Sequence, residues 1–159
     1  MADRFVTTGA MDADNATVVG LEAALIWNSF SLQAEYVTSD VDSAPSGDPR
    51  FDAYYVMVSW FVTDEHRTYS KSKGAFGRIL PEENLDFDAG TWGALEIAVR
   101  FSSIDLTDGL VKGRGLQDLT GGLNWYLNPN TRITLNYILA NRLRAGDTDI
   151  FMIRIQIDF

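Results

Sequence analysis

Apolar and polar residues alternate with a period of two along most of this chain, and the last nine residues show the pattern most clearly. Five apolar side chains of one parity lie there: Phe151, Ile153, Ile155, Ile157 and Phe159. Because a β-strand directs successive side chains to opposite faces, this segment predicts a strand with one apolar and one polar face. The apolar face would meet a core in a soluble sandwich or lipid in a transmembrane barrel.

The same alternation recurs in six earlier segments, namely residues 16–27, 30–36, 51–62, 92–102, 119–127 and 131–141. With the terminal segment they predict seven strands, and residues 4–8 are a candidate eighth. Most of the segments exceed the roughly 5 to 6 residues that are usual for strands of globular proteins. Asn28-Ser29 and Asn128-Pro129-Asn130 fit tight turns between neighbouring strands. The pattern predicts an all-β, antiparallel up-and-down sheet.

The connections and the aromatic residues favour a transmembrane β-barrel over a soluble one. Short connections at 28–29, at 128–130 and, if His66 begins another strand, at 64–65 alternate with long ones at 38–50, 105–116 and 142–148, as in outer-membrane barrels. Aromatic residues gather at strand ends, as in interfacial girdles: Trp27, Phe30, Trp60, Phe61, Trp92, Trp125, Tyr126 and Phe159. Residues 66–89 lack periodicity, and loops of that length are usually functional or mobile.

Composition excludes several classes of protein. The length of 159 residues suggests one domain. The chain holds no run of the ~18 to 20 apolar residues that a membrane helix needs, whereas alternating strands would escape that criterion. The net charge of -9 argues against a nucleic-acid partner. Without cysteine, the chain has no disulfides, thiolate metal sites or cysteine nucleophile.

Charged residues on the polar strand faces are the candidate functional residues, because charges on a pore wall set its ion preference. Seven share the inward parity: Glu22, Glu35, Glu96, Arg100, Arg132, Arg154 and Asp158. The three arginines could form a basic stripe that attracts anions, or they could pair with the carboxylates at 96 and 158 across neighbouring strands. In the aperiodic loop, Lys71, Lys73 and Arg78 could recruit anions at a pore mouth, or belong to a solvated loop of mixed charge with the acidic residues at 82–88.

The sequence gives little support for a metal site or for catalysis. Asp12, Asp14, Asp40 and Asp42 lack the glycine and distal glutamate of an EF-hand loop. His66 is the one histidine, too few for a usual zinc site, and no nucleophile-elbow motif accompanies it. We therefore expect no cofactor, no metal and no enzymatic activity.

Six segments carry a resemblance to a known family: Trp60–His66, Gly74–Ile79 with Pro81, Gly93–Ser102, Ile104–Leu106, Gly121–Asn130 and the terminal strand. In sequence, order and spacing they resemble the C-terminal part of the phosphate-selective porin O and P family of Gram-negative outer membranes. The run Gly-Leu-Asn-Trp-Tyr-Leu-Asn-Pro-Asn, which ends at Asn130, is the most specific of them.

The resemblance implies a sixteen-stranded, trimeric, anion-preferring porin of the bacterial outer membrane, of which residues 1–159 would form the C-terminal part. Its function would be passive diffusion of small anions, phosphate or polyphosphate among them, through a polar lumen. Its partners would be outer-membrane lipid, the barrel-assembly machinery, and either the missing part of the barrel or identical subunits. The family's selectivity is attributed to arginines and lysines that lie largely in the N-terminal half, so phosphate preference rests here on analogy alone.

Two alternatives stay open, a small side-chain-filled eight-stranded outer-membrane barrel with a structural or anchoring role and a soluble ligand-binding barrel. Seven or eight strands of a sixteen-stranded pattern would leave two unpaired edges, which lipid does not tolerate. The N-terminus lacks the apolar region of a signal peptide, which suggests a mature chain or a piece of a longer one. The Phe-ending terminal strand resembles a barrel-assembly signal, so we expect a native C-terminus and any missing part before Met1.

Overall fold

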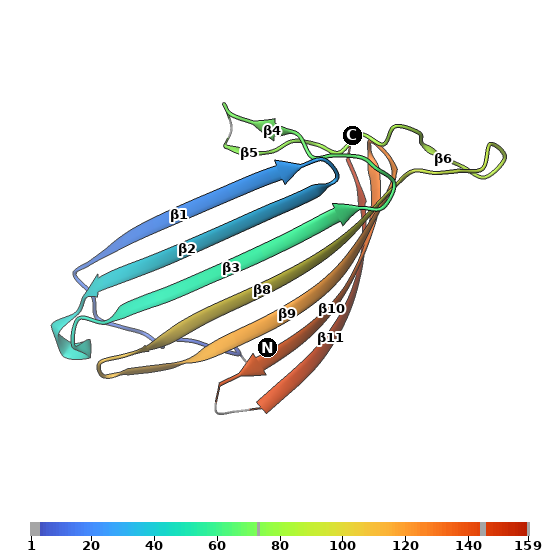
Figure 1. Cartoon of the computed structure of the whole chain (residues 1–159). Helices are drawn as coiled ribbons and strands as arrows, with labels where there is room; N and C mark the ends of the chain where they lie inside the picture. Colours follow the sequence, from blue (N-terminus) through green and yellow to red (C-terminus); the bar gives the residue numbers. More distant parts are fainter. Residues whose placement is uncertain (1–3, 73, 144–145, 159) are drawn as a thin grey trace.

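Seven long antiparallel strands form one curved sheet in this computed structural model, which describes residues 4–72, 74–143 and 146–158 (Figure 1). The strands are β1 (Asn15–Trp27), β2 (Phe30–Asp42), β3 (Arg50–Phe61), β8 (Ala94–Asp108), β9 (Val111–Asn128), β10 (Thr131–Arg142) and β11 (Gly146–Ile157). Each pairs with its neighbour in that order, so the topology is up-and-down. The all-β antiparallel fold and its seven strands confirm the prediction from alternation, and the open sheet resembles part of a barrel wall.

The long connection between β3 and β8 contains four two-residue strands. They are β4 (Tyr69–Ser70), β5 (Ala75–Phe76), β6 (Leu85–Asp86) and β7 (Thr91–Trp92), and they pair as β4 with β5 and β6 with β7. A short 3-10 helix, Ala44–Ser46, lies between β2 and β3. Among the residues described, no helix is long and apolar enough to cross a membrane.

The predicted eighth strand at residues 4–8 is wrong. This segment has no strand structure, and its backbone donates a single hydrogen bond to the sheet, from the Thr7 N–H to the Gly113 carbonyl (3.2 Å). Its two apolar residues, Phe5 and Val6, are adjacent rather than alternating, so they give it no single face to bury.

The predicted long loop at 105–116 is also wrong, because β8 and β9 continue through it to a turn at Gly109-Leu110. The pairs Thr107–Lys112 and Asp108–Val111 extend the ladder to that turn. Hydropathy no longer alternates there because polar residues occupy both faces, yet backbone pairing persists. The predicted loops at 38–50 and 142–148 shorten in the same way, since β2 runs to Asp42 and β11 begins at Gly146.

The predicted alternation of short and long connections therefore does not hold. The connections at residues 28–29, 62–93 and 129–130 lie at one end of the sheet, which we call the turn end, and those at 43–49, 109–110 and 143–145 lie at the other. The longest connection thus shares an end with two of the shortest.

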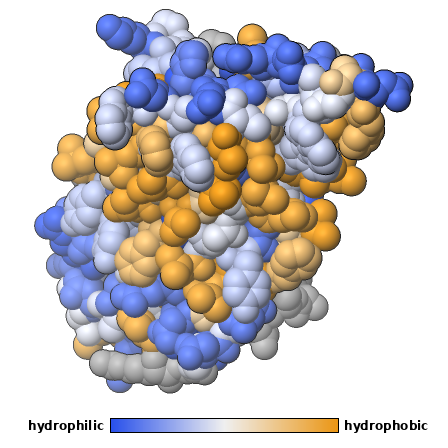
Figure 2. All heavy atoms as spheres, turned by 45° about the vertical axis from the view of Figure 1, so that its right-hand side comes forward, coloured by the Kyte–Doolittle hydropathy of each residue, from blue (hydrophilic) through white to orange (hydrophobic). Residues whose placement is uncertain are grey.

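The two faces of the sheet differ in polarity as the alternation predicts. The apolar side chains of one parity, which we call the outer face, remain exposed: Leu21 is 68% exposed, Ile155 67% and Val99 50%. Figure 2 shows these apolar residues as a band between polar ends. The opposite, inner face carries the polar set. A globular core would bury the apolar set, so this sheet is built to meet an apolar environment on its outer face.

Aromatic side chains border the outer face at both ends of the strands. At the turn end, Phe30 stacks between Trp27 and Trp60, with ring centroids 6.3 and 5.8 Å away. Towards the opposite end, Tyr54 and Phe101 lie 6.1 Å apart. Two of the aromatic residues predicted for the girdles, Phe61 and Tyr126, do not lie on the outer face.

Phe61 and Tyr126 belong to a small apolar cluster on the inner face rather than to a girdle. They pack with Ile79 and Ala94, and Phe61 is only 1% exposed. Both side chains point to the same face of the sheet as the polar residues. The face to which a side chain points, and not its position near the end of a strand, therefore decides whether an aromatic residue belongs to the girdle.

Candidate functional site

The strand register gathers polar side chains of β8, β9, β10 and β11 on the inner face near the turn end. Glu96 lies opposite Asn124, and Tyr126 lies opposite Arg132. Arg132 in turn lies opposite Gln156 of the edge strand β11. Directly opposed residues of an antiparallel pair are close enough for side-chain contact, so the register itself builds this group.

Glu96 is the buried centre of the group. Its side chain has 0% exposure and forms an ion pair with Arg67 of the long connection. It also accepts hydrogen bonds from Asn124 Nδ2 (3.1 Å) and from the Tyr126 hydroxyl (3.0 Å). A buried carboxylate is tolerated only when it is paired and hydrogen-bonded, and these three donors meet that requirement.

Arg67 brings the long connection onto the inner face. Its guanidinium carbon lies 5.8 Å from the ring centroid of Phe61 and 5.3 Å from that of Phe76, both within cation–π range. Its side chain is 14% exposed. Sequence periodicity does not single out this residue, because it follows the last alternating position of β3 and belongs to no periodic pattern.

Arg132 and Arg154 meet on Gln156. Arg132 donates to Gln156 Oε1 (2.8 Å) and to the Tyr126 hydroxyl (3.4 Å), and Arg154 donates to the same Oε1. Gln156 Nε2 donates to both carboxylate oxygens of Asp158, at 3.0 and 3.3 Å. Two guanidinium groups therefore share one neutral acceptor, which leaves their positive charge uncompensated at that contact.

Arg78 of the long connection lies 3.8 Å from Asp158, in an exposed ion pair. In the part of the chain that the structure describes, Asp158 thus pairs with Arg78, and Glu96 pairs with Arg67. The sequence left two arrangements open, a basic stripe of arginines and cross-strand ion pairs between the arginines and the carboxylates, and the structure contains neither in full. Arg132 and Arg154 lie together, whereas the two carboxylates form ion pairs with arginines of the long connection.

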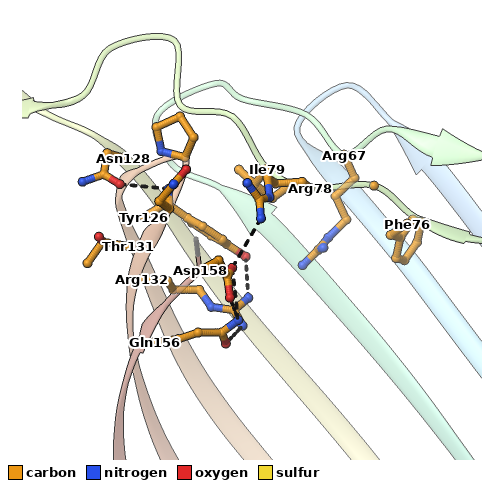
Figure 3. Close-up of a pocket in the computed structure, with 13 residues that line it drawn as sticks. Arg67, Phe76, Arg78, Ile79, Tyr126, Asn128, Thr131, Arg132, Gln156 and Asp158 are labelled. Atoms are coloured by element: carbon orange, nitrogen blue, oxygen red, sulfur yellow. Dashed lines mark hydrogen bonds and ion pairs between the residues drawn. The ribbon is translucent and has the colours of Figure 1, made fainter.

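A pocket of about 270 Å³ opens between these groups, as Figure 3 shows. Its lining contains three guanidinium groups, those of Arg67, Arg78 and Arg132, and one carboxylate, that of Asp158. Backbone and side chains of the turn at 128–131 complete the wall. Guanidinium groups bind carboxylates and phosphates through paired N–H donors, so the pocket suits a small oxyanion.

Arg100 lies apart from that pocket, further along β8. Its guanidinium carbon is 4.5 Å from the ring centroid of Tyr55, and both residues line a second hollow of about 290 Å³ with Glu35. Glu22 lies opposite Glu35 in the register of β1 and β2. The charged residues predicted to face the lumen thus share the inner face but form two separate groups.

The remaining candidates are dispersed. Lys71 is exposed between β4 and β5, and Lys73 lies outside the described residues. The terminal apolar set occupies the outer face of β11, with Phe151, Ile153, Ile155 and Ile157 all at least 60% exposed. Phe159 lies outside the described residues. Within the described part of the chain, no three His, Cys, Asp or Glu side chains are grouped to hold a metal ion.

Comparison with known proteins gives consistent matches. The sequence model of the family described as phosphate-selective porin O and P matches residues 1–159. Porin O of Pseudomonas aeruginosa is 29% identical over 160 residues, which cover 90% of this chain and 35% of that protein. An uncharacterized protein of Caulobacter vibrioides is 31% identical over 166 residues, covering 98% of this chain and 33% of that protein.

The chain therefore spans about a third of the length of these two relatives. The family match extends over the whole chain. This chain belongs to the phosphate-selective porin O and P family.

Proposed function

We propose that this chain forms the C-terminal part of the wall of an outer-membrane porin through which small anions diffuse passively. The observation that carries the proposal is the inner-face pocket, where Arg67 and Arg78 pair with Glu96 and Asp158, and Arg132, which has no carboxylate partner among the described residues, adds a positive charge. A wall of this kind raises the local concentration of anions and lowers that of cations. No covalent chemistry is required.

The outer face supports the membrane part of the proposal. Its apolar side chains are exposed along every long strand, and aromatic residues border them at both ends. A strand of 13 residues such as β1 is about 43 Å long at 3.3 Å per residue, and a tilt near 45° reduces this to about 30 Å across the bilayer. That height matches the hydrocarbon core.

The two edges of the sheet show what else the barrel needs. The outer edges of β1 and β11 have no strand partner among the described residues. Unpaired backbone groups are not tolerated in lipid, so further strands must pair with both edges. We propose that these come from the rest of a sixteen-stranded barrel that assembles as a homotrimer with the help of the barrel-assembly machinery.

The small eight-stranded alternative is not proposed, because residues 4–8 do not form the eighth strand that it requires. Phosphate is a plausible solute in chemical terms, since a phosphate oxyanion accepts paired hydrogen bonds from guanidinium groups. We propose small oxyanions as the solute class, with phosphate as the first to test.

Single-channel recording of the full-length protein in planar bilayers tests this function. We expect stable conductance steps in potassium chloride that fall when phosphate is added, because phosphate should occupy the arginine-lined pocket for longer than chloride. In Arg132→Gln the phosphate effect should weaken, whereas Arg142→Gln, on the same strand and face ten residues away, should retain it. An absence of conductance steps, or equal phosphate effects in both variants, would contradict the proposal.

A further inference from the structure

The connection between β3 and β8, residues 62–93, lies over the inner face at the turn end of the sheet in its first part, up to Ile79, whereas its β6–β7 part extends away from the sheet (Figure 1). On one side, its residues Tyr69 and Phe76 share a small hollow with Glu22 and Gln33 of β1 and β2. On the other side, Ile79 packs in the cluster with Phe61, Ala94 and Tyr126. Arg78 also pairs with Asp158, the residue after β11, so the contacts of the segment reach from β1 and β2 to the end of β11 (Figure 3).

Little within the 62–93 segment holds this position. Its four strands pair through two residue pairs each, β4 with β5 and β6 with β7. Backbone hydrogen bonds to the sheet lie near its two ends, where the Val62 N–H donates to the Leu95 carbonyl (2.8 Å) and the Trp92 carbonyl accepts from Trp125 Nε1 (2.6 Å). Such short pairings are marginal by themselves, so the middle of the segment depends on side-chain contacts with the wall.

The most deeply buried ion pair among those contacts joins Arg67 and Glu96. Glu96 belongs to β8 and is fully buried, and Arg67 belongs to the segment. Arg67 also lies between Phe61 of the wall and Phe76 of the segment, within cation–π distance of both rings. The same guanidinium group thus joins the wall to β4 and β5.

We propose that the buried Arg67–Glu96 ion pair holds the first part of the 62–93 segment over the inner face and thereby sets the free cross-section at the turn end of the lumen. The proposal rests on the porin function proposed above for its second half, since only a channel has a cross-section to set. Arg67 and Glu96 are then positioning residues, which act on solute flow through the segment that they hold.

The position of the segment can be measured without any ion current. These 159 residues contain no cysteine, so an Ile79→Cys substitution introduces one thiol on the buried side of the segment. Any cysteine in the rest of the full-length protein is first replaced by serine. In outer membranes that contain the full-length protein, this thiol should react slowly with a small water-soluble thiol reagent. Reaction requires the segment to open, so its rate reports the opening equilibrium.

In the Ile79→Cys background we expect Glu96→Gln and Arg67→Gln each to increase the reaction rate by about tenfold or more. Glu35→Gln makes the same chemical change on the inner face, away from the segment, and should leave the rate within about twofold. Heat-dependent migration on gels checks that each barrel has folded. Arg67→Gln leaves the buried Glu96 carboxylate without its cation, so the double variant Arg67→Gln/Glu96→Gln, which removes the ion pair without leaving a buried charge, tests the proposal where either single variant prevents folding.

If Ile79→Cys reacted at the same rate with and without Arg67→Gln, the proposed role of the ion pair would be wrong. The same conclusion would follow if Glu35→Gln increased the reaction rate as much as Arg67→Gln does. The effect on the cross-section is tested by single-channel recording of the double variant Arg67→Gln/Glu96→Gln, which removes the ion pair without changing the net charge of the inner face. We expect a larger conductance than in wild type. Increased labelling with unchanged conductance would refute the effect on cross-section, whereas a wild type without any current would refute the porin function and leave the labelling result standing.

Discussion

An arginine substituted in the middle of the outer face should destabilise the folded protein far more than an arginine at the adjacent residue of the same strand, whose side chain points to the inner face. Val99 lies on the outer face of β8 and is 50% exposed, whereas Ala98 belongs to the inner face. The outer positions of β8 are apolar from Leu95 to Phe101 and polar again at Ser103. Val99 is therefore near the middle of the apolar band.

If that band faces lipid, Val99→Arg should destabilise the folded barrel by about 2 to 4 kcal/mol, the usual cost of an arginine near the bilayer midplane. At 1.4 kcal/mol for each factor of ten, this is roughly 30- to 700-fold in the folding equilibrium. Ala98→Arg should cost much less, because its side chain would enter the aqueous lumen beside Ser59 and Gly122.

Guanidinium titration of the full-length protein in lipid vesicles measures both variants. Tryptophan fluorescence reports the transition, since Trp27 and Trp60 are exposed on the outer face and would leave lipid on unfolding. Equal costs for Val99→Arg and Ala98→Arg would refute the assignment of the two faces. A cost confined to Ala98→Arg would show that the faces are reversed.

Two further predictions concern the packing of the inner face. Tyr126→Phe removes one of the three donors to the buried Glu96 carboxylate and should destabilise the barrel by about 1 to 3 kcal/mol in the same titration, with no change expected in the strand signal of its circular dichroism. Gly93→Ala should lower the free energy of unfolding by more than about 1 kcal/mol, because Gly93 has a φ of 68° and an added Cβ would collide with the Tyr126 carbonyl oxygen. Gly121→Ala is the matched control, since no atom lies within 4 Å of the added Cβ, and a stability loss as large as that of Gly93→Ala would contradict the steric argument.

Alternation alone located the strands and their two faces, because a barrel wall exposes one face to an apolar medium and the other to water. It failed where that contrast ends. Beyond the apolar band, at Thr107 and Lys112, both faces meet water, so the ladder continues without any hydropathy signal. The strands are therefore longer than their amphipathic segments.

Only those residues of the candidate site that lie on strands could be predicted from the sequence. Parity places Glu96 and Arg132 on the inner face, since each belongs to an alternating segment. Arg67 reaches Glu96 from 29 positions away in the sequence, through a connection with no period. Tertiary packing of that connection determines the contact, and no local pattern in the residues around Arg67 encodes it.

The most direct test of the proposed function is the reversal potential of single channels formed by the full-length protein across a potassium chloride gradient. The surplus of guanidinium groups in the inner-face pocket predicts a potential with the sign of chloride selectivity. A reversal potential of the opposite sign would show that cations are preferred, and it would contradict the account of this chain as part of an anion-conducting porin wall.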